Sequence, residues 1–178
     1  MNTRILKKKN CLITGATGGI GEEISKQLAT LSCNLFLTST NKTKLEKLKK
    51  NLGKINTSIA IETFHVNLDS EENVLELIKH VRKKFASINI LINCAGIFMI
   101  KSIEKSTIED FDKSINLNVK VPFILSREFS KDMITKKWGR IMFVGSSSSY
   151  SGFENGSVYC TSKHSVLGLS RALNIELK

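Results

Sequence analysis

The sequence predicts an α/β fold in which a parallel β-sheet carries helices on both faces, and three observations support this prediction. Short apolar runs alternate with segments whose apolar residues recur at helical spacing. The apolar runs are continuous, as expected for parallel strands that are buried on both faces. A cluster of glycines lies where the first apolar run meets the first helical segment, between positions 15 and 21. Strand–helix alternation with right-handed crossovers favours a doubly wound sheet.

Five strands are expected along the chain, each followed by a helix. The expected strands cover residues 11–14, 35–38, 59–66, 90–92 and 141–144. Ser70 is placed to cap the third helix, and Ser106 with Glu109 forms a capping-box pattern at the start of the long fourth helix. Pro122 lies inside this fourth helix and is expected to kink it or to limit its hydrogen bonding, because proline cannot donate the helical hydrogen bond. The fold class is therefore a doubly wound, Rossmann-like sheet in a single domain.

A length of 178 residues is enough for one domain with a hydrophobic core. The composition, 41% hydrophobic and 24% charged, is that of an ordinary globular protein. No apolar run approaches the roughly 20 residues that a membrane-spanning helix needs. The basic amino terminus is followed by only a short apolar stretch, so no secretion signal is recognised. We therefore expect a cytoplasmic protein without a membrane partner.

The spacing of the cysteines and the net charge of +11 bear on two possible partners, a metal ion and nucleic acid. Cys11, Cys33, Cys94 and Cys160 are widely separated, which favours free thiols in a reducing compartment over a zinc site. A basic surface can attract nucleic acid or a phosphorylated ligand. The lysines are spread along helical segments such as 42–54, as is typical of solvated faces, so we expect neither a metal nor a nucleic-acid partner.

The glycine cluster has the sequence Thr14-Gly15-Ala16-Thr17-Gly18-Gly19-Ile20-Gly21 and joins the first strand to the first helix. A turn without side chains lets a pyrophosphate approach the backbone, and the free N–H groups at a helix start attract its negative charge. A tight turn with no ligand is the structural alternative. Glycines lower helix propensity, and the close approach of a ligand would explain their presence here. Their position directly after the first strand therefore favours a dinucleotide site.

The end of the second strand bears on the choice between NAD and NADP. An acidic residue there would bind the ribose hydroxyls of NAD, and the segment Thr38-Ser39-Thr40 contains none. These hydroxyls can donate hydrogen bonds to a 2′-phosphate, and Lys42 and Lys44 follow just beyond. A dedicated arginine is missing, so the pattern favours NADP only modestly and leaves NAD open.

A tyrosine and a lysine lie four residues apart, at positions 159 and 163. Residues at this spacing share one face of a helix. A tyrosine hydroxyl ordinarily titrates near pH 10, and a nearby positive charge favours its phenolate form. Such a tyrosine can exchange a proton with a carbonyl or an alcohol. The pair alone is weak evidence, because many helices contain this spacing with a solvated lysine.

Other polar residues fall at strand ends that meet the same edge of the predicted sheet. The segment Asn93-Cys94-Ala95-Gly96 ends the fourth strand, and Ser146 follows the fifth, thirteen residues before Tyr159. Asn118 lies within the long fourth helix. Ligands of doubly wound sheets bind at the carboxyl ends of the strands, so these groups point toward one crevice.

Taken together, these motifs resemble the compact type of the short-chain dehydrogenase/reductase family over essentially the whole chain. The resemblance implies an NAD(P)-dependent oxidoreductase in which Tyr159 transfers a proton and Lys163 binds the ribose and tunes Tyr159. It implies that Ser146 binds the substrate oxygen and that Asn118 holds a water linked to Lys163. The implied cofactor-binding residues, to which the strand-end argument adds Thr40, are Gly15, Thr17, Gly19, Ile20, Gly21, Asn67, Leu68, Asn93, Ala95, Gly96, Tyr159 and Lys163.

Several alternatives remain open at this point. The serine of the site could be a neighbour of Ser146 within the run to Ser149, and Asn116 competes with Asn118. Asn93 could be purely structural. At the level of function, the glycine turn also suits a sugar-nucleotide epimerase or dehydratase-type relative, or a sensor that binds NAD(P) without turnover.

The resemblance also implies what lies around this core. The family continues with further strands and a mobile substrate lid, whereas this sequence stops at Lys178 inside the last expected helix. We therefore expect the substrate lid to be absent and turnover of this chain to be uncertain. The family's two long helices form dimer faces, so a homodimer or homotetramer acting on a small carbonyl or alcohol substrate is expected.

Overall fold

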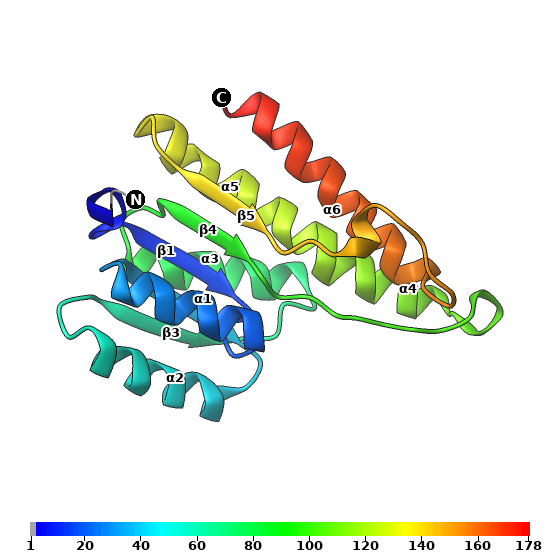
Figure 1. Cartoon of the computed structure of the whole chain (residues 1–178), viewed down its shortest axis with the longest axis horizontal. Coiled ribbons are helices and arrows are strands. Elements are labelled where there is room, and N and C mark those ends of the chain that lie inside the picture. Colours follow the sequence, from blue (N-terminus) through cyan, green and yellow to red (C-terminus); the bar gives the residue numbers. More distant parts are fainter. Residues whose placement is uncertain (1–2) are drawn as a thin grey trace.

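The computed structural model describes residues 3–178 and contains a five-stranded, fully parallel β-sheet (Figure 1). The strand order is β3-β2-β1-β4-β5. The chain adds β2 and β3 on one side of β1 and then crosses to add β4 and β5 on the other side. The strands are β1 (Asn10–Thr14), β2 (Asn34–Ser39), β3 (Ile61–His65), β4 (Ile90–Asn93) and β5 (Arg140–Phe143). The expected doubly wound sheet is confirmed, and the strand bounds differ from the expected ones by at most two residues at either end.

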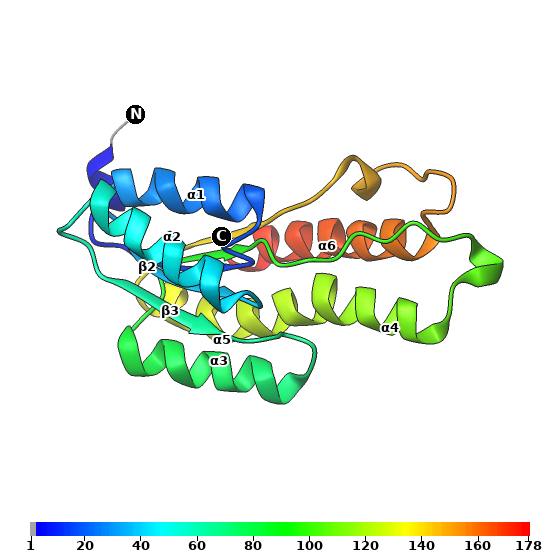
Figure 2. The same ribbon diagram turned by 90° about the horizontal axis from the view of Figure 1, so that it is seen from below.

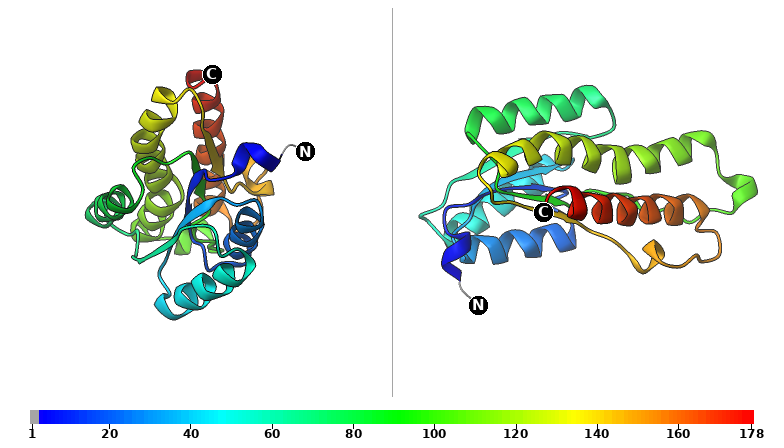
Figure 3. Two further views of the ribbon diagram at one scale, coloured as in Figure 1. Left: turned by 90° about the vertical axis from the view of Figure 1, so that its left-hand side faces the viewer. Right: turned by 90° about the horizontal axis from the view of Figure 1, so that it is seen from above.

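Helices cover both faces of this sheet, as Figures 2 and 3 show. They are α1 (Gly19–Thr30), α2 (Lys42–Ile55), α3 (Glu71–Lys84), α4 (Ile108–Ile115), α5 (Val121–Thr135) and α6 (Ser157–Glu176). One buried cluster packs strand residues such as Ile13 and Leu37 against Leu45 of α2. The other packs Phe36 and Leu91 against residues of α3 and α5. Two apolar cores, one on each face, therefore hold the strands in place.

The long fourth helix differs from its expected form. It consists of α4, a π-helical turn at Asn116–Lys120, and α5, which lie end to end in Figure 2. Pro122 lies in the first turn of α5, where its missing N–H removes no helical bond of that segment. The α-helical hydrogen-bond pattern is thus interrupted by a π-helical turn just before the proline.

The caps of the helices show one correct and one wrong expectation. Ser70 caps α3, accepting a hydrogen bond from the Asn73 amide at 3.2 Å. The expected capping box of Ser106 and Glu109 is wrong by one residue, because Thr107 and Asp110 form the box of α4. The Ser106 hydroxyl instead donates to the Ser102 carbonyl at 2.9 Å, within the preceding turn. No helix among residues 3–178 has the length and apolar character needed to cross a membrane.

Candidate active site

The glycine turn after β1 lies directly against the chain that leaves β4. Gly15 has a left-handed backbone with φ of 64°, and a Cβ atom there would lie 2.8 Å from the backbone of Ala95. A Cβ on Gly21 would lie 2.4 Å from the Gly15 carbonyl oxygen. A Cβ on Gly19 would meet no atom within 4 Å. Gly15 and Gly21 therefore permit backbone packing, whereas Gly19 borders open space at the start of α1.

The amino terminus of α1 offers free backbone donors at this open space. Its N-cap residue is Gly18, which provides no side-chain cap, and the first helical bond runs from the Glu22 amide to the Gly18 carbonyl. The amides of the first turn therefore have no partner within the helix. With the helix dipole, such amides attract a phosphate group. Thr17, which was expected at the cofactor, lies beside this turn with its hydroxyl 2.5 Å from that of Ser39.

Thr14 links the glycine turn to β4, a role that no pattern in the sequence indicates. Its hydroxyl oxygen accepts hydrogen bonds from the amides of Cys94 and Ala95 at 3.2 Å and 3.1 Å. Asn93 and Gly96 flank this contact, and Asn93 is buried with its Nδ2 3.4 Å from the Met142 carbonyl. The segment expected beside the nicotinamide ribose therefore lies next to the glycine turn.

The end of β2 corrects the expected 2′-phosphate contacts. Thr38 is 1% exposed and Ser39 is 8% exposed, so neither side chain faces an outside ligand. Ser39 also accepts a hydrogen bond from the Asn41 amide at 3.2 Å. Thr40 is exposed, and the first turn of α2 carries Lys42 and Lys44 but no acidic residue. Of the three hydroxyls, only that of Thr40 is available.

The two residues expected at the adenine lie after β3. Asn67 is exposed, and its side chain donates to Asp69 at 2.7 Å. Leu68 is 4% exposed and packs into the core on the face of α3 and α5. The Asn67 side chain is therefore open to a ligand here, whereas the Leu68 side chain is not.

Tyr159 and Lys163 share one face of α6, at the carboxyl edge of the sheet. The Lys163 ammonium lies 5.7 Å from the centre of the Tyr159 ring. Lys163 is 8% exposed, and its Nζ donates to the Val144 carbonyl, just after β5, at 2.8 Å. Burial lowers the pKa of Lys163 from its ordinary value, and the nearby Cys94 thiol partly opposes this shift. The tyrosine is half-buried, so its ring is partly open to a ligand.

Asn118 lies in the π-helical turn and is 2% exposed. Its side chain accepts from the Ile97 amide at 2.9 Å and donates to the Ile97 carbonyl at 3.0 Å and to the Ser162 hydroxyl at 2.9 Å. Its side chain therefore joins the chain after β4 to α6. Its backbone carbonyl lacks the usual helical donor four residues later, because that residue is Pro122.

The competing asparagine has a different setting. Asn116 donates from its side chain to the Asp69 carbonyl at 2.9 Å, on the loop between β3 and α3. It contributes no side-chain contact to α6 among the described hydrogen bonds of residues 3–178. Between the two candidates, the link to the helix of Tyr159 belongs to Asn118.

The serine-rich loop after β5 orders itself around Ser146. The Ser146 oxygen accepts from the Ser148 amide at 3.2 Å, and the Ser146 amide donates to the Ser149 hydroxyl at 3.2 Å. Ser148 and Ser149 are buried at 6% and 3% exposure, whereas Ser146 is half-exposed and Ser147 exposed. Burial therefore disfavours Ser148 and Ser149 as substrate-binding serines, and the short turn formed by residues 147–149 packs against α6.

A parallel doubly wound sheet, an uncapped glycine turn and a tyrosine–lysine pair at one edge are together typical of an NAD(P)-dependent oxidoreductase. The family model described as short chain dehydrogenase matches residues 9–178, and the chain belongs to this family. The expected family, fold and enzyme class are confirmed. The roles of the individual site residues stay predictions.

Two similar sequences support this assignment. The chain is 35% identical to 3-oxoacyl-[acyl-carrier-protein] reductase FabG of Rickettsia bellii, over 97% of this chain and 68% of the relative. The FabG of Rickettsia conorii is 36% identical over the same shares. The chain thus spans about two thirds of the length of these relatives.

Solved structures give the same result. NAD+-bound xylitol dehydrogenase has a TM-score of 0.88 and 28% identity, over 97% of this chain and 66% of that one. A metagenomic short-chain oxidoreductase in complex with NADP has a TM-score of 0.90 and 25% identity, over 97% and 77%. A short-chain dehydrogenase from Sphingobium yanoikuyae in complex with NADPH has a TM-score of 0.88 and 28% identity, over 95% and 66%.

The glycine turn yields a matched pair of variants. Gly21→Ala places a methyl group against the Gly15 carbonyl and is expected to lower the free energy of unfolding by about 1–3 kcal/mol. Gly19→Ala adds a methyl group in open space and is expected to leave stability unchanged or raise it by about 0.4–1 kcal/mol. Urea unfolding followed by circular dichroism measures both. Equal destabilisation by the two substitutions would contradict the assigned packing.

Proposed function

We propose that this chain holds a nicotinamide dinucleotide against a carbonyl or secondary alcohol and that Tyr159 donates or accepts the proton of the reaction. The observation that carries the proposal is the Lys163 ammonium, 5.7 Å from the Tyr159 ring on a shared helix face. At this position the ammonium can stabilise negative charge that develops on the tyrosine oxygen during proton transfer. The bound dinucleotide would supply or receive the hydride.

The residues present fit such a group. The open space beside Gly19 and the uncapped start of α1 suit a pyrophosphate. The proposed binding residues are Gly15, Thr17, Gly19, Ile20 and Gly21 for the pyrophosphate, Thr40, Asn67 and Leu68 for the adenosine, and Asn93, Ala95, Gly96, Tyr159 and Lys163 for the nicotinamide riboside. Lys163 has three N–H donors, of which the Val144 carbonyl uses one, so two can bind ribose hydroxyls.

Two further residues complete the proposed proton chemistry. The half-exposed Ser146 hydroxyl would hydrogen-bond the substrate oxygen and share the charge that develops on it. The backbone carbonyl of Asn118, which Pro122 leaves without its usual donor, would hold a water. That water would relay a proton between Lys163 and solvent.

Two other functions share parts of this site. A sugar-nucleotide epimerase would use the same glycine turn, but the short spacing from Ser146 to Tyr159 and the Asn93–Gly96 segment favour the reductase or dehydrogenase. A sensor without turnover would bind the dinucleotide equally well. Nicotinamide absorbance at about 340 nm with a panel of carbonyls separates them, because a sensor binds the cofactor and does not oxidise it.

Tyr159→Phe tests the proton transfer. This variant is expected to lose about 10²- to 10⁴-fold of the carbonyl-dependent NADPH oxidation, because the ring remains and the acid–base group is gone. Its affinity for NADPH, measured by nicotinamide fluorescence, is expected to stay within about twofold of the parent.

The second tyrosine supplies the control. Tyr150 is 70% exposed, so Tyr150→Phe is expected to leave both turnover and cofactor affinity unchanged. Full turnover in Tyr159→Phe, or an equal loss in both variants, would sink the proposed role of Tyr159.

We also propose that NADP is preferred over NAD. The end of β2 and the first turn of α2 carry no acidic residue, and the exposed Thr40, Lys42 and Lys44 suit a 2′-phosphate. Titration with both cofactors is expected to show tighter binding of NADP, and Lys44→Glu is expected to weaken or reverse the preference. Equal affinities in the parent chain would remove this proposal.

Self-association and location are the remaining proposals. Large apolar side chains are exposed on α4, α5 and α6: Ile108, Phe111, Phe123, Ile134 and Ile175. We propose that these helices form a homodimer or homotetramer face, and that the free cysteines place the protein in the cytoplasm. Sedimentation at micromolar concentration is expected to give a mass above that of one chain, and a monomer would contradict it.

A further inference from the structure

Two loops that are far apart in sequence meet beside Tyr159. One follows β4 and carries residues 94–107, and the other leads into α6 and carries residues 150–156; both lie at the same end of the molecule in Figures 1 and 2. The Lys101 amide of the first loop donates to the Asn155 carbonyl of the second at 2.8 Å. The Lys101 side chain also forms an ion pair with Asp110 of α4 at 2.5 Å. The loops are therefore fixed relative to each other and to α4.

An aromatic cluster lies where these loops approach the tyrosine. The Phe98 ring stands edge-on to the Tyr159 ring, with centres 4.7 Å apart and planes at 85°. The Phe153 ring lies 6.4 Å from the Tyr159 ring and 6.2 Å from the Phe98 ring. Phe98 is 63% exposed and Phe153 is 39% exposed. Two phenylalanines thus present apolar surface to solvent at the side of the proposed proton donor, at a cost in free energy that a ligand can recover.

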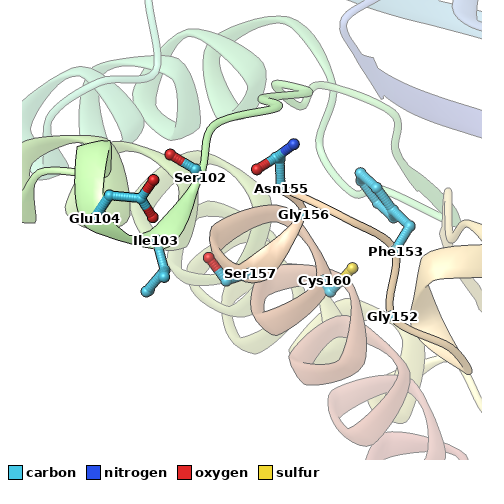
Figure 4. A pocket seen from close by; sticks show the side chains of 9 residues that line it. All are labelled: Ser102, Ile103, Glu104, Gly152, Phe153, Asn155, Gly156, Ser157 and Cys160. Carbon is cyan, nitrogen blue, oxygen red and sulfur yellow. The ribbon is translucent and has the colours of Figure 1, made fainter.

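A cavity adjoins this cluster and shares Phe153 with it. Its volume is about 270 Å³, and Figure 4 shows it between the two loops and the start of α6. Ile103 and the buried Cys160 are among its other lining residues. The cavity has room for a ring-sized group beside the Phe153 ring.

We propose that Phe98 and Phe153 form an apolar wall that selects carbonyl substrates with an aryl or alicyclic substituent over hydroxylated ones. The inference rests on the proposed function, since it takes the Tyr159 hydroxyl as the point where the carbonyl oxygen binds. A substituent on that carbonyl carbon lies within one or two bonds of the oxygen, near a tyrosine ring whose centre is 4.7 Å from that of Phe98 and 6.4 Å from that of Phe153. An aryl group gains contact area and ring–ring geometry there. A hydroxylated group gives up hydrogen bonds to water that these rings cannot replace.

Binding of ketones to the complex of this chain with NADP+ tests the wall. The oxidised cofactor cannot reduce a ketone, so the measurement reads binding alone. Saturation-transfer NMR is used to titrate acetophenone and hydroxyacetone, with and without NADP+. Acetophenone is expected to bind about tenfold more tightly than hydroxyacetone, as a pair of aromatic contacts allows.

Substitutions at Phe98 separate the effect of an apolar side chain from the effect of side-chain size. Phe98→Gln keeps a long side chain but is expected to lose most of the tenfold preference, whereas Phe98→Leu is expected to retain it. Leu75→Ala removes an apolar side chain of comparable exposure, 46%, on α3 and is the matched control with no expected effect. Phe153→Gln and Phe153→Leu repeat the comparison, so a folding defect in one variant, seen by circular dichroism, does not end the test.

The outcomes distinguish the wall from the proposed function. Equal or tighter binding of hydroxyacetone, or an unchanged preference in folded Phe98→Gln and Phe153→Gln, overturns the wall. Failure of NADPH to bind or of Tyr159→Phe to lose turnover counts against the proposed function instead. Tyr159→Phe retains a ring beside Phe98, so it is expected to keep the acetophenone preference while losing proton transfer.

Discussion

The site depends on the contact between the turn after β1 and the chain after β4. Gly15 brings its backbone so close to Ala95 that any side chain on it would collide, and the Thr14 hydroxyl holds the two amides of Cys94 and Ala95. Close packing of this kind leaves backbone atoms little freedom to move apart. The glycine turn and the chain that leaves β4 are therefore parts of one rigid unit.

From this contact a series of hydrogen bonds leads to the helix that carries the tyrosine. The chain after β4 reaches Ile97, whose amide and carbonyl both bind the Asn118 side chain. Asn118 donates to the Ser162 hydroxyl, and Ser162 donates to the Tyr159 carbonyl at 2.8 Å. Every member is buried or half-buried, so the bonds are made in a setting where a lost partner is costly. Positioning of the tyrosine thus begins at the glycine turn, far away in sequence.

The sequence predicted the sheet, its parallel pairing and the groups at its carboxyl edge because these follow from local patterns. Glycine spacing, continuous apolar strands and the separation of Tyr159 from Lys163 each constrain a few neighbouring residues. The roles of Thr14 and Ser162 depend on contacts between segments that are distant in sequence, as does the burial of Thr38, and no local pattern marks them. The sequence does not predict the aromatic cluster of Phe98 and Phe153 either, because its members belong to two loops without periodicity.

The burial of Lys163 is the strongest sign that this edge of the sheet is built for chemistry. The residue is 8% exposed and its ammonium donates to the Val144 carbonyl, and desolvation lowers its pKa. An apolar side chain of similar length would avoid this cost, and folding alone gives no reason to prefer a lysine there. A residue that lowers the stability of the fold is expected at positions where function requires it. The charge lies beside a tyrosine ring, and its two further N–H donors suit the ribose-binding role proposed for it, which would account for the cost.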